Sequence, residues 1–356
     1  MSKNVLYYSY DKHSDSYFVT GRDKYTTTAE IASVFNDGEN GQKTVTKIGY
    51  KAFYQSEFLR NITIPNTITE IGQRAFSECD ALIKVELPDS VLTLGNEAFS
   101  YCKKLKTINL SKNLVNLGDA TFMGCEQLEF VNVPQSVTKI GIANFKDCVN
   151  LKKLSLHNNI NKILNDAFFN CENLTSIEIP SNVSFIGEGA FQNCENLKEV
   201  VIPNGVKRIK GSTFNNCTNL ISVTLPNSLR EIGWKAFTLC KSLKNIVIPN
   251  SVEIIGDAAF QNCVNLASVQ FSKNLKTIHD HSFTNCTSLI EITIPTGVEK
   301  IGEYAFWNCE KMEKAIIPIS VKNIDKTAFT SVPEKALNDY NEWKKYNSMR
   351  TFCLDK

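Results

Sequence analysis

Cysteine and histidine are the side chains of this chain that suit nucleophilic catalysis or metal binding. The sequence contains 12 cysteines and four histidines. Eleven of the cysteines recur every 23 residues without a slip, and Cys353 falls outside this period. The eleven are Cys79, Cys102, Cys125, Cys148, Cys171, Cys194, Cys217, Cys240, Cys263, Cys286 and Cys309. A fixed period indicates a repeat architecture, so the cysteines must be interpreted by their place in the repeat.

Metal binding and disulfide formation are two alternatives for these cysteines. Zinc sites need C-x-x-C pairs or nearby histidines, and neither occurs at zinc-like spacing. Cysteines on neighbouring rungs, ~4.8 Å apart, lie within the Cα separation of a disulfide. However, side chains that project in parallel need not meet its torsional requirement, and eleven is an odd number. The pattern favours buried free thiols that pack as small hydrophobic groups.

The histidines offer two further candidates for chemistry. Cys286 and His281 could form a nucleophile and base, but Cys286 occupies the repeated position. His279, Asp280 and His281 resemble a metal site but lack an indicated third ligand, which is typical of a solvated turn. The sequence has no glycine-rich phosphate loop, G-x-S-x-G elbow or H-E-x-x-H motif. We therefore expect no catalytic residue, no metal and no cofactor, and predict that the protein is not an enzyme.

The repeat predicts the local structure of each coil. Phenylalanine recurs thirteen times with the same period, from Phe53 to Phe329. The unit reads I-G-x-x-A-F-x-x-C-x-x-L-x-x-(V/I)-x-(L/I)-P-x-x-(V/L)-x-x. Residues 82–87 alternate as in a short strand, and Pro88 ends its pairing. Residues 91–94 form a return segment, and residues 98–102 suit one helical or 3₁₀ turn with Ala, Phe and Cys inward.

A single coil cannot bury these residues, whereas a stack of identical coils can. We therefore predict an α/β repeat solenoid with one parallel β-strand per 23-residue coil and about 13 coils. Residues 1–44 contain strand-like runs and predict an N-terminal β-type cap. Residues 45–331 carry the repeats. Residues 332–356 predict a C-terminal capping helix and tail, with Ala336, Leu337, Tyr340 and Trp343 toward the last coil.

Composition excludes several classes of function. The 39 Lys+Arg residues nearly balance the 37 Asp+Glu residues, so the formal charge of +2 gives no reason to expect nucleic acid as a partner. No apolar run approaches the ~18–20 residues of a membrane span. The first residues lack the pattern of a secretory signal, so a cytoplasmic location is kept as an alternative.

The repeat resembles the BspA-like, or Treponema pallidum type, of leucine-rich repeat. The resemblance rests on the strings IGQRAFSEC, IGEGAFQNC and IGEYAFWNC, each followed by a leucine and a strand that ends in proline. It covers about residues 45–331. It implies a non-enzymatic recognition protein, typically a surface or secreted antigen that binds host proteins or other cells. The resemblance therefore implies a cell-surface or extracellular location, with a cytoplasmic location as the alternative, and an intracellular scaffold is the alternative function.

The outward residues of the strands are the candidate binding site, because the concave face of a solenoid is its usual binding surface. This face is mostly Ser, Thr, Asn and Glu, with scattered apolar residues that also fit an unselected solvent face. Two tryptophans near the A-F turn are expected to be exposed and are further anchor candidates. The candidates are Phe130, Asn132, Val201, Val247, Ile316, Trp234 and Trp307. We expect a monomer that binds a host or self protein.

Overall fold

The computed structural model describes the backbone of residues 5–354 and the side chains of residues 5–348. The chain is a parallel β-solenoid of about 12 turns with coils of about 23 residues, which confirms the predicted fold class. The chain divides after Asn182 into two compact units, here called unit 1 and unit 2.

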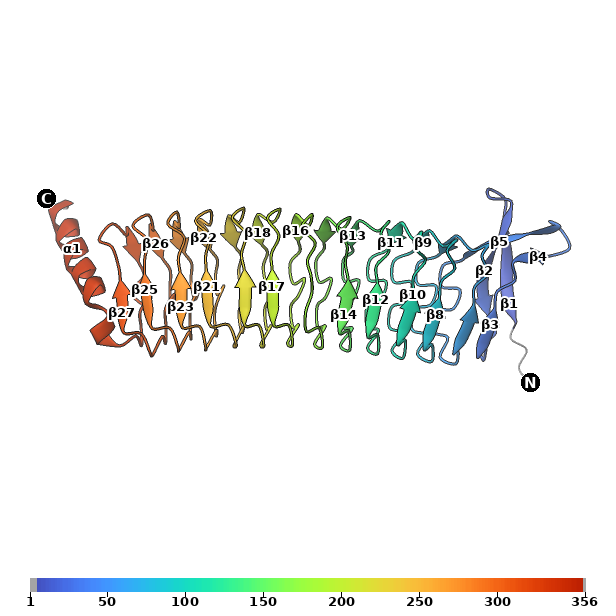
Figure 1. The fold of residues 1–356 in the computed structure, drawn as a ribbon, viewed down its shortest axis with the longest axis horizontal. Coiled ribbons are helices and arrows are strands. Elements are labelled where there is room, and N and C mark those ends of the chain that lie inside the picture. The colour runs from blue at the N-terminus through green and yellow to red at the C-terminus, as the bar shows by residue number, and fades with distance from the viewer. Residues whose placement is uncertain (1–4, 355–356) are drawn as a thin grey trace. The chain divides into compact units, whose positions relative to one another are not determined.

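The first ladder of the solenoid, here called the front ladder, is formed by the one strand per coil that the sequence predicts (Figure 1). Most of its three-residue strands bury the middle side chain and turn the outer two to solvent, as the alternation predicts. In unit 1 they are β6 (Asn61–Thr63), β8 (Lys84–Glu86), β10 (Thr107–Asn109), β12 (Phe130–Asn132) and β14 (Lys153–Ser155). In unit 2 they are β17 (Glu199–Val201), β19 (Ser222–Thr224), β21 (Asn245–Val247), β23 (Ser268–Gln270), β25 (Glu291–Thr293) and β27 (Lys314–Ile316).

A second ladder, here called the return ladder, was not predicted. The return segment of each coil pairs in parallel over two residues, too few for an alternating pattern to be recognised in sequence. In unit 1 its strands are β7 (Glu70–Ile71), β9 (Thr93–Leu94), β11 (Asn116–Leu117), β13 (Lys139–Ile140) and β15 (Lys162–Ile163). In unit 2 they are β16 (Phe185–Ile186), β18 (Arg208–Ile209), β20 (Glu231–Ile232), β22 (Ile254–Ile255), β24 (Thr277–Ile278), β26 (Lys300–Ile301) and β28 (Asn323–Ile324).

The A-F turn is neither helical nor 3₁₀, so that local prediction is wrong. Arg74 and Glu78 flank Phe76 with φ of 55° and 61°, and the pattern recurs along the chain. The N–H groups of these three residues donate to the next coil, at 3.0, 2.8 and 2.8 Å. The N–H groups between them, on Ala75 and Ser77, bond within their own turn instead. A 3₁₀ helix would use every N–H inside the coil, whereas this alternation creates a third inter-coil ladder.

Asparagine often fills the second left-handed position of this turn. Asn tolerates a positive φ better than most residues, because its short side chain can hydrogen-bond locally. In unit 2, Asn285 donates from its side-chain amide to Asn262 at 2.7 Å and accepts from Asn308 at 3.0 Å. These side chains therefore bond from rung to rung beside the backbone ladder.

The core is a set of columns in which each side chain packs on its own kind. Within each unit, successive phenylalanine rings of the repeat lie 4.9–6.0 Å apart and within 18° of parallel. Phe237, for example, is fully buried between Phe214 and Phe260. Aromatic pairs at such distances stabilise beyond the area that they bury.

The cysteines of the repeat are buried free thiols. The thiols donate to the backbone carbonyl of the phenylalanine one coil earlier, as Cys102 does to Phe76 at 3.0 Å. Ser56 fills the slot in the first coil and donates to the Phe53 carbonyl at 2.6 Å. Burial raises the pKa of these thiols, that of Cys263 to about 12. Cysteine is therefore both an apolar filler and a hydrogen-bond donor here.

The recurring glycine after the return strand is explained by close approach of coils. At Gly95 an added Cβ would lie 2.5 Å from the backbone nitrogen of Gln73 in the preceding coil. Its φ is not in the left-handed region, since Gly95 is not among the residues with positive φ. Contact, and not backbone freedom, therefore selects glycine here, and Leu164 can occupy the same slot where the coils allow it.

The N-terminal residues are bonded to both ladders of unit 1. β2 pairs in parallel with β5, and β5 pairs in parallel with β7 of the return ladder. β3 pairs in parallel with β6 of the front ladder. β1 and β4 add antiparallel partners to β2 and β5. The strands are β1 (Leu6–Asp11), β2 (Ser16–Arg22), β3 (Thr28–Glu30), β4 (Val34–Asn36) and β5 (Gln42–Ile48).

A helix, α1 (Asn338–Leu354), follows the last coil after a short 3₁₀ turn, η1 (Glu334–Ala336). Tyr340 and Trp343 of α1 are buried, and the Trp343 indole N–H donates to the Val321 carbonyl at 2.8 Å. The Tyr340 ring lies 5.0 Å from that of Phe329, the last member of the phenylalanine column.

Replacing Phe237 with alanine should lower the free energy of unfolding by ~3–5 kcal/mol, because the ring is fully buried between two others. Phe130→Ala is the matched control, since its ring is 41% exposed and should cost less than ~1 kcal/mol. Chemical denaturation followed by circular dichroism measures both. Equal losses would contradict the column as the main stabilising element.

Stability should fall as pH rises above ~8.5, the ordinary thiol pKa. The unfolded chain then releases thiol protons that the folded chain retains, because the folded pKa values are raised. Guanidinium denaturation of the native protein and of the variant Cys240→Ala/Cys263→Ala at pH 7.5 and 10 measures this. The variant should lose less stability with pH, by at most ~1.4 kcal/mol per pH unit for each thiol removed. Identical pH dependence would contradict the assignment.

Candidate binding faces

The front ladder of unit 2 presents two strongly exposed valines. Val201 and Val247 are 63% and 59% exposed, although the middle residues of β17 and β21 are buried. Thr224 of β19 lies opposite Val201 in register and separates it from Val247. At ~4.8 Å per rung the two valines are roughly 10 Å apart. An apolar pair with this spacing, set among polar residues, can receive two apolar side chains of a partner.

Ile316 lies on the same ladder but is half-buried, so its side chain is less exposed than those of the two valines. It belongs to β27, beside which α1 packs. The Ile317 N–H donates to the Asp339 carboxylate of this helix at 3.3 Å. The helix therefore limits access to this end of the front ladder.

Phe130 and Asn132 lie on the front ladder of unit 1, and both are exposed. Phe130 follows Glu129, whose carboxylate contacts Lys152 at 3.1 Å and Lys106 at 3.3 Å. Hydrogen bonds from Lys152 and then Lys106 lower the pKa of Glu129. The aromatic ring is thus set beside an exposed charged cluster, an arrangement that suits the rim of a protein interface.

The two tryptophans lie on the A-F turn, a different side of the coil from the front ladder. Trp234 is 46% exposed and lies against Gly211, where its ring leaves no space for a Cβ. Trp307 is half-buried and packs edge-on against Tyr304 at 6.4 Å. The expectation of exposure is therefore right for Trp234 and wrong for Trp307, whose neighbouring aromatic residue covers it.

An apolar pair on the return side of unit 1 escaped the sequence analysis. Leu92 and Val115 are 45% and 54% exposed and adjacent, since the Val115 N–H donates to the Leu92 carbonyl at 2.9 Å. Other coils have threonine in this slot, at Thr69 and Thr138. Comparing one outward slot across coils would have identified the pair.

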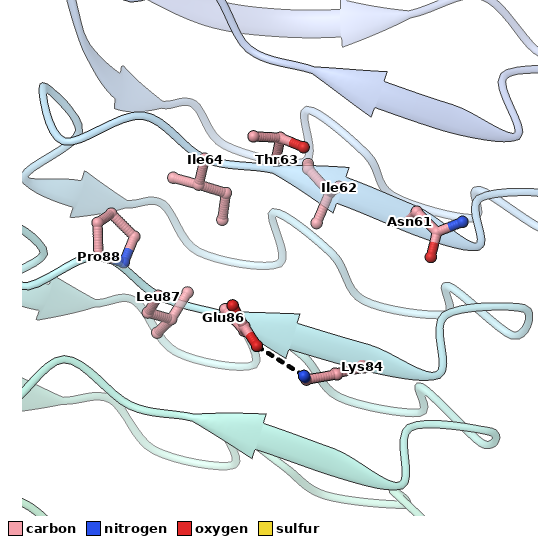
Figure 2. A pocket seen from close by; sticks show the side chains of 8 residues that line it. All are labelled: Asn61, Ile62, Thr63, Ile64, Lys84, Glu86, Leu87 and Pro88. Carbon is pink, nitrogen blue, oxygen red and sulfur yellow. Dashed lines mark ion pairs between the residues drawn. The ribbon is translucent and has the colours of Figure 1, made fainter.

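Outward residues of β6 and β8 line a shallow groove of about 490 Å³ in unit 1 (Figure 2). Asn61 and Thr63 face Lys84 and Glu86, which form an ion pair at 2.6 Å. The groove contains hydrogen-bonding groups but no nucleophile paired with a base. It can contact a polar segment and has no arrangement for bond cleavage.

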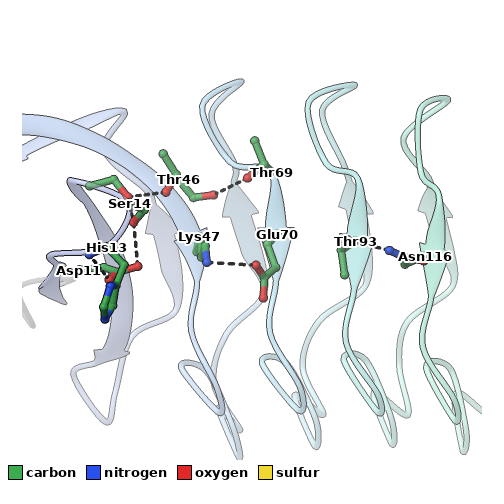
Figure 3. Close-up of polar contacts among 10 residues, drawn as sticks. Asp11, His13, Ser14, Thr46, Lys47, Thr69, Glu70, Thr93 and Asn116 are labelled. Carbon is green, nitrogen blue, oxygen red and sulfur yellow. Dashed lines mark hydrogen bonds and ion pairs between the residues drawn. The ribbon is translucent and has the colours of Figure 1, made fainter.

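Ser14, His13 and Asp11 form a cluster at the N-terminal hairpin that contains the residue types of a catalytic triad (Figure 3). However, the Ser14 hydroxyl donates directly to Asp11 at 2.7 Å, and His13 contacts Asp11 through its backbone N–H at 3.0 Å. These bonds lower the pKa of Asp11, that from Ser14 most. The Ser14 hydroxyl thus reaches the carboxylate without the His13 imidazole between them, so the cluster is a hydrogen-bonded turn.

The polar contacts continue along the return ladder as structural bonds. Lys47 pairs with Glu70 at 3.3 Å, and Asn116 donates to Thr93 at 3.4 Å (Figure 3). Each links neighbouring rungs. Such exposed contacts contribute little to stability, so they serve mainly to satisfy polar side chains.

The histidine and cysteine candidates do not converge. His279 faces Asp257 at 3.4 Å, whereas the His281 ring stacks on Tyr304 at 5.2 Å. Cys286 is buried, burial raises its pKa well above the ordinary value, and its thiol donates to the Phe260 carbonyl at 3.3 Å. Within residues 5–348, no three His, Cys, Asp or Glu side chains are grouped to hold a metal ion.

Stacked coils with parallel strands, short turns and an inward Leu, Phe and Cys core define a leucine-rich-repeat solenoid. The model of the BspA type leucine rich repeat region matches in six copies, over residues 40–152, 115–232, 139–266 and 209–336. The chain therefore belongs to the BspA type of leucine-rich repeat proteins, which confirms the resemblance.

Solved structures agree with this assignment. A leucine-rich repeat protein from Bacteroides ovatus is 28% identical, with a TM-score of 0.77 over 94% of this chain and 92% of that chain. A leucine rich cell surface protein from Faecalibacterium prausnitzii is 27% identical, with a TM-score of 0.63 over 95% and 94%. The pneumococcal vaccine antigen PcpA, 18% identical with a TM-score of 0.56 over 94% and 96%, shares the fold. A comparison with curated proteins gave no match.

Leucine-rich repeat folds commonly bind proteins, and this family is generally non-enzymatic. None of the helices in the described part of the chain combines the length and apolar character needed to cross a membrane.

Proposed function

We propose that the chain is a non-enzymatic surface antigen or adhesin that binds a host or self protein through the front ladder. The exposure of Val201 and Val247 carries this proposal. Both side chains are more than half exposed on a ladder whose other outward residues in unit 2 are mostly polar. Burying such a pair in an interface removes apolar area from water, whereas leaving it exposed gains nothing.

Two similar structures support the surface role by what their names state. The Faecalibacterium prausnitzii protein is described as a cell surface protein, and PcpA as a vaccine antigen. An intracellular scaffold is the second candidate, because eleven free thiols suit a reducing compartment. Protease treatment of intact source cells separates the two: digestion supports the surface role, and protection supports the scaffold.

Replacing both Val201 and Val247 with aspartate should weaken partner binding at least tenfold. Each buried valine contributes ~1.5–3 kcal/mol, and a buried aspartate adds a desolvation cost. The partner is first captured by cross-linking from host secretions and self lysates, then purified. Its Kd for each variant is measured by biolayer interferometry.

Ile254→Asp is the matched control, since Ile254 is 37% exposed but lies on the return ladder. It should bind like the native protein, and all variants should keep the native circular dichroism. Unchanged affinity of the double valine variant for the partner would contradict the front-ladder proposal.

We further propose that residues 1–44 and 332–356 cap the repeats of residues 45–331. The pairing of β3 with β6 and of β5 with β7 supports the first cap, and the burial of Trp343 supports the second. Caps of this kind cover strand edges that would otherwise pair with other chains.

Replacing Trp343 with alanine should lower the denaturation midpoint and promote aggregation, because it removes a buried ring and the indole hydrogen bond. Tyr346→Ala is the control on the same helix, since Tyr346 is 47% exposed. Light scattering during thermal unfolding measures both. A Trp343 variant as stable and soluble as the Tyr346 variant would argue against a capping role.

A further inference from the structure

The return ladder of unit 2 contains a hollow of about 370 Å³ with three cationic residues on its lining. The residues around it are Ser184, Phe185, Ile186, Gly205, Lys207, Arg208 and Lys210. No acidic residue is among them. Other hollows differ: the groove at β6 and β8 pairs Lys84 with Glu86, and that beside the N-terminal hairpin contains Lys47 with Glu70.

Two of the three positive charges of this hollow have no carboxylate partner among the described residues. Arg208 pairs with Glu231 at 3.3 Å, and Arg230 on the next rung pairs with Glu253 at 3.7 Å. Lys207 and Lys210 form no ion pair with the described residues. Two lysines therefore keep their charge available at one opening, where an incoming anion replaces water and not a protein carboxylate.

The shape of the hollow depends on two further residues. Gly205 packs closely on the preceding coil, where an added Cβ would lie 2.9 Å from the Val183 carbonyl oxygen. The absence of a side chain there leaves the hollow open. Phe185 is half-buried beside the cations and offers an aromatic surface. Charge, space and an apolar surface thus occur together.

We propose that this hollow, here called the basic hollow, binds a sulfated or phosphorylated sugar residue of an anionic glycan. Lys207 and Lys210 contact the tetrahedral oxyanion, whose oxygens accept hydrogen bonds from ammonium donors. Phe185 packs against the apolar side of the sugar ring. A hollow of about 370 Å³ falls within the size range of small-ligand sites, whereas a flat membrane surface could not enter it.

The test uses the full chain and defined probes. Binding of dextran sulfate, a mannose 6-phosphate polymer, unmodified dextran and poly-L-glutamate is measured by isothermal titration calorimetry at 0.15 M NaCl. Sulfated or phosphorylated probes should bind and unmodified dextran should not. The stronger of the two oxyanion probes identifies the natural source, sulfate or phosphate ester.

Lys207→Ala/Lys210→Ala should weaken binding of the oxyanion probe at least tenfold. Lys276→Ala/Lys300→Ala is the matched control, because both lysines are exposed, Lys276 directly precedes β24 and Lys300 begins β26, and the net charge changes equally. This control should lose less than twofold. Phe185→Ala should weaken binding of the sugar polymer more than binding of inorganic sulfate, because sulfate has no ring to pack against Phe185.

Two results would overturn the proposal. Equal losses in the two lysine variants would show binding to net charge alone. Poly-L-glutamate binding as tightly as the oxyanion probes would show an acidic-peptide site instead. The valine double variant of the front ladder should bind the glycan normally, so the test succeeds or fails independently of the proposed protein partner.

Discussion

Backbone hydrogen bonds between successive coils are the constraint on which the structure depends. Each coil bonds to the next on three sides: the front ladder, the return ladder and the A-F turn. In one coil these include Leu87 to Asn109, Gly95 to Ile71 and Phe99 to Thr121, at 2.8–2.9 Å. An inserted residue would shift register on at least one side, so the length of 23 is fixed by all three together. Identical slots then face each other, and only side chains that pack well on their own kind, such as phenylalanine and cysteine, can fill the core.

The same constraint separates the residues that build the fold from those that can carry function. Inward slots must repeat, whereas outward slots are free to differ from coil to coil. Val201, Val247 and Lys207 each differ from most residues in their own column, and none is needed for stacking. Both proposed sites therefore lie at departures from the repeat, on a scaffold whose spacing is set by the backbone. The two proposed faces use different sides of the coil, so one molecule could contact a protein and a glycan together.

The period allowed the solenoid, the front strand and the inward Phe, Leu and Cys residues to be predicted from sequence. The return ladder could not be predicted, because two residues per coil carry too little alternation. The left-handed positions were hidden because residues such as Arg74 and Glu78 hold them in place of glycine. The basic hollow depends on residues of two coils. Such features arise from contacts between coils, which a pattern within one coil does not contain.

The buried thiols also report where the stack opens locally. A coil that opens loses its donor bond to the preceding phenylalanine carbonyl, and its cysteine becomes accessible and able to ionise. Since a repeat stack opens from its ends or at weak interfaces, the order in which the eleven thiols react with an alkylating reagent would map local stability along the chain. Each repeated cysteine thus reports the opening of its own coil, and the added mass of the alkylated peptide measures how often that coil opens.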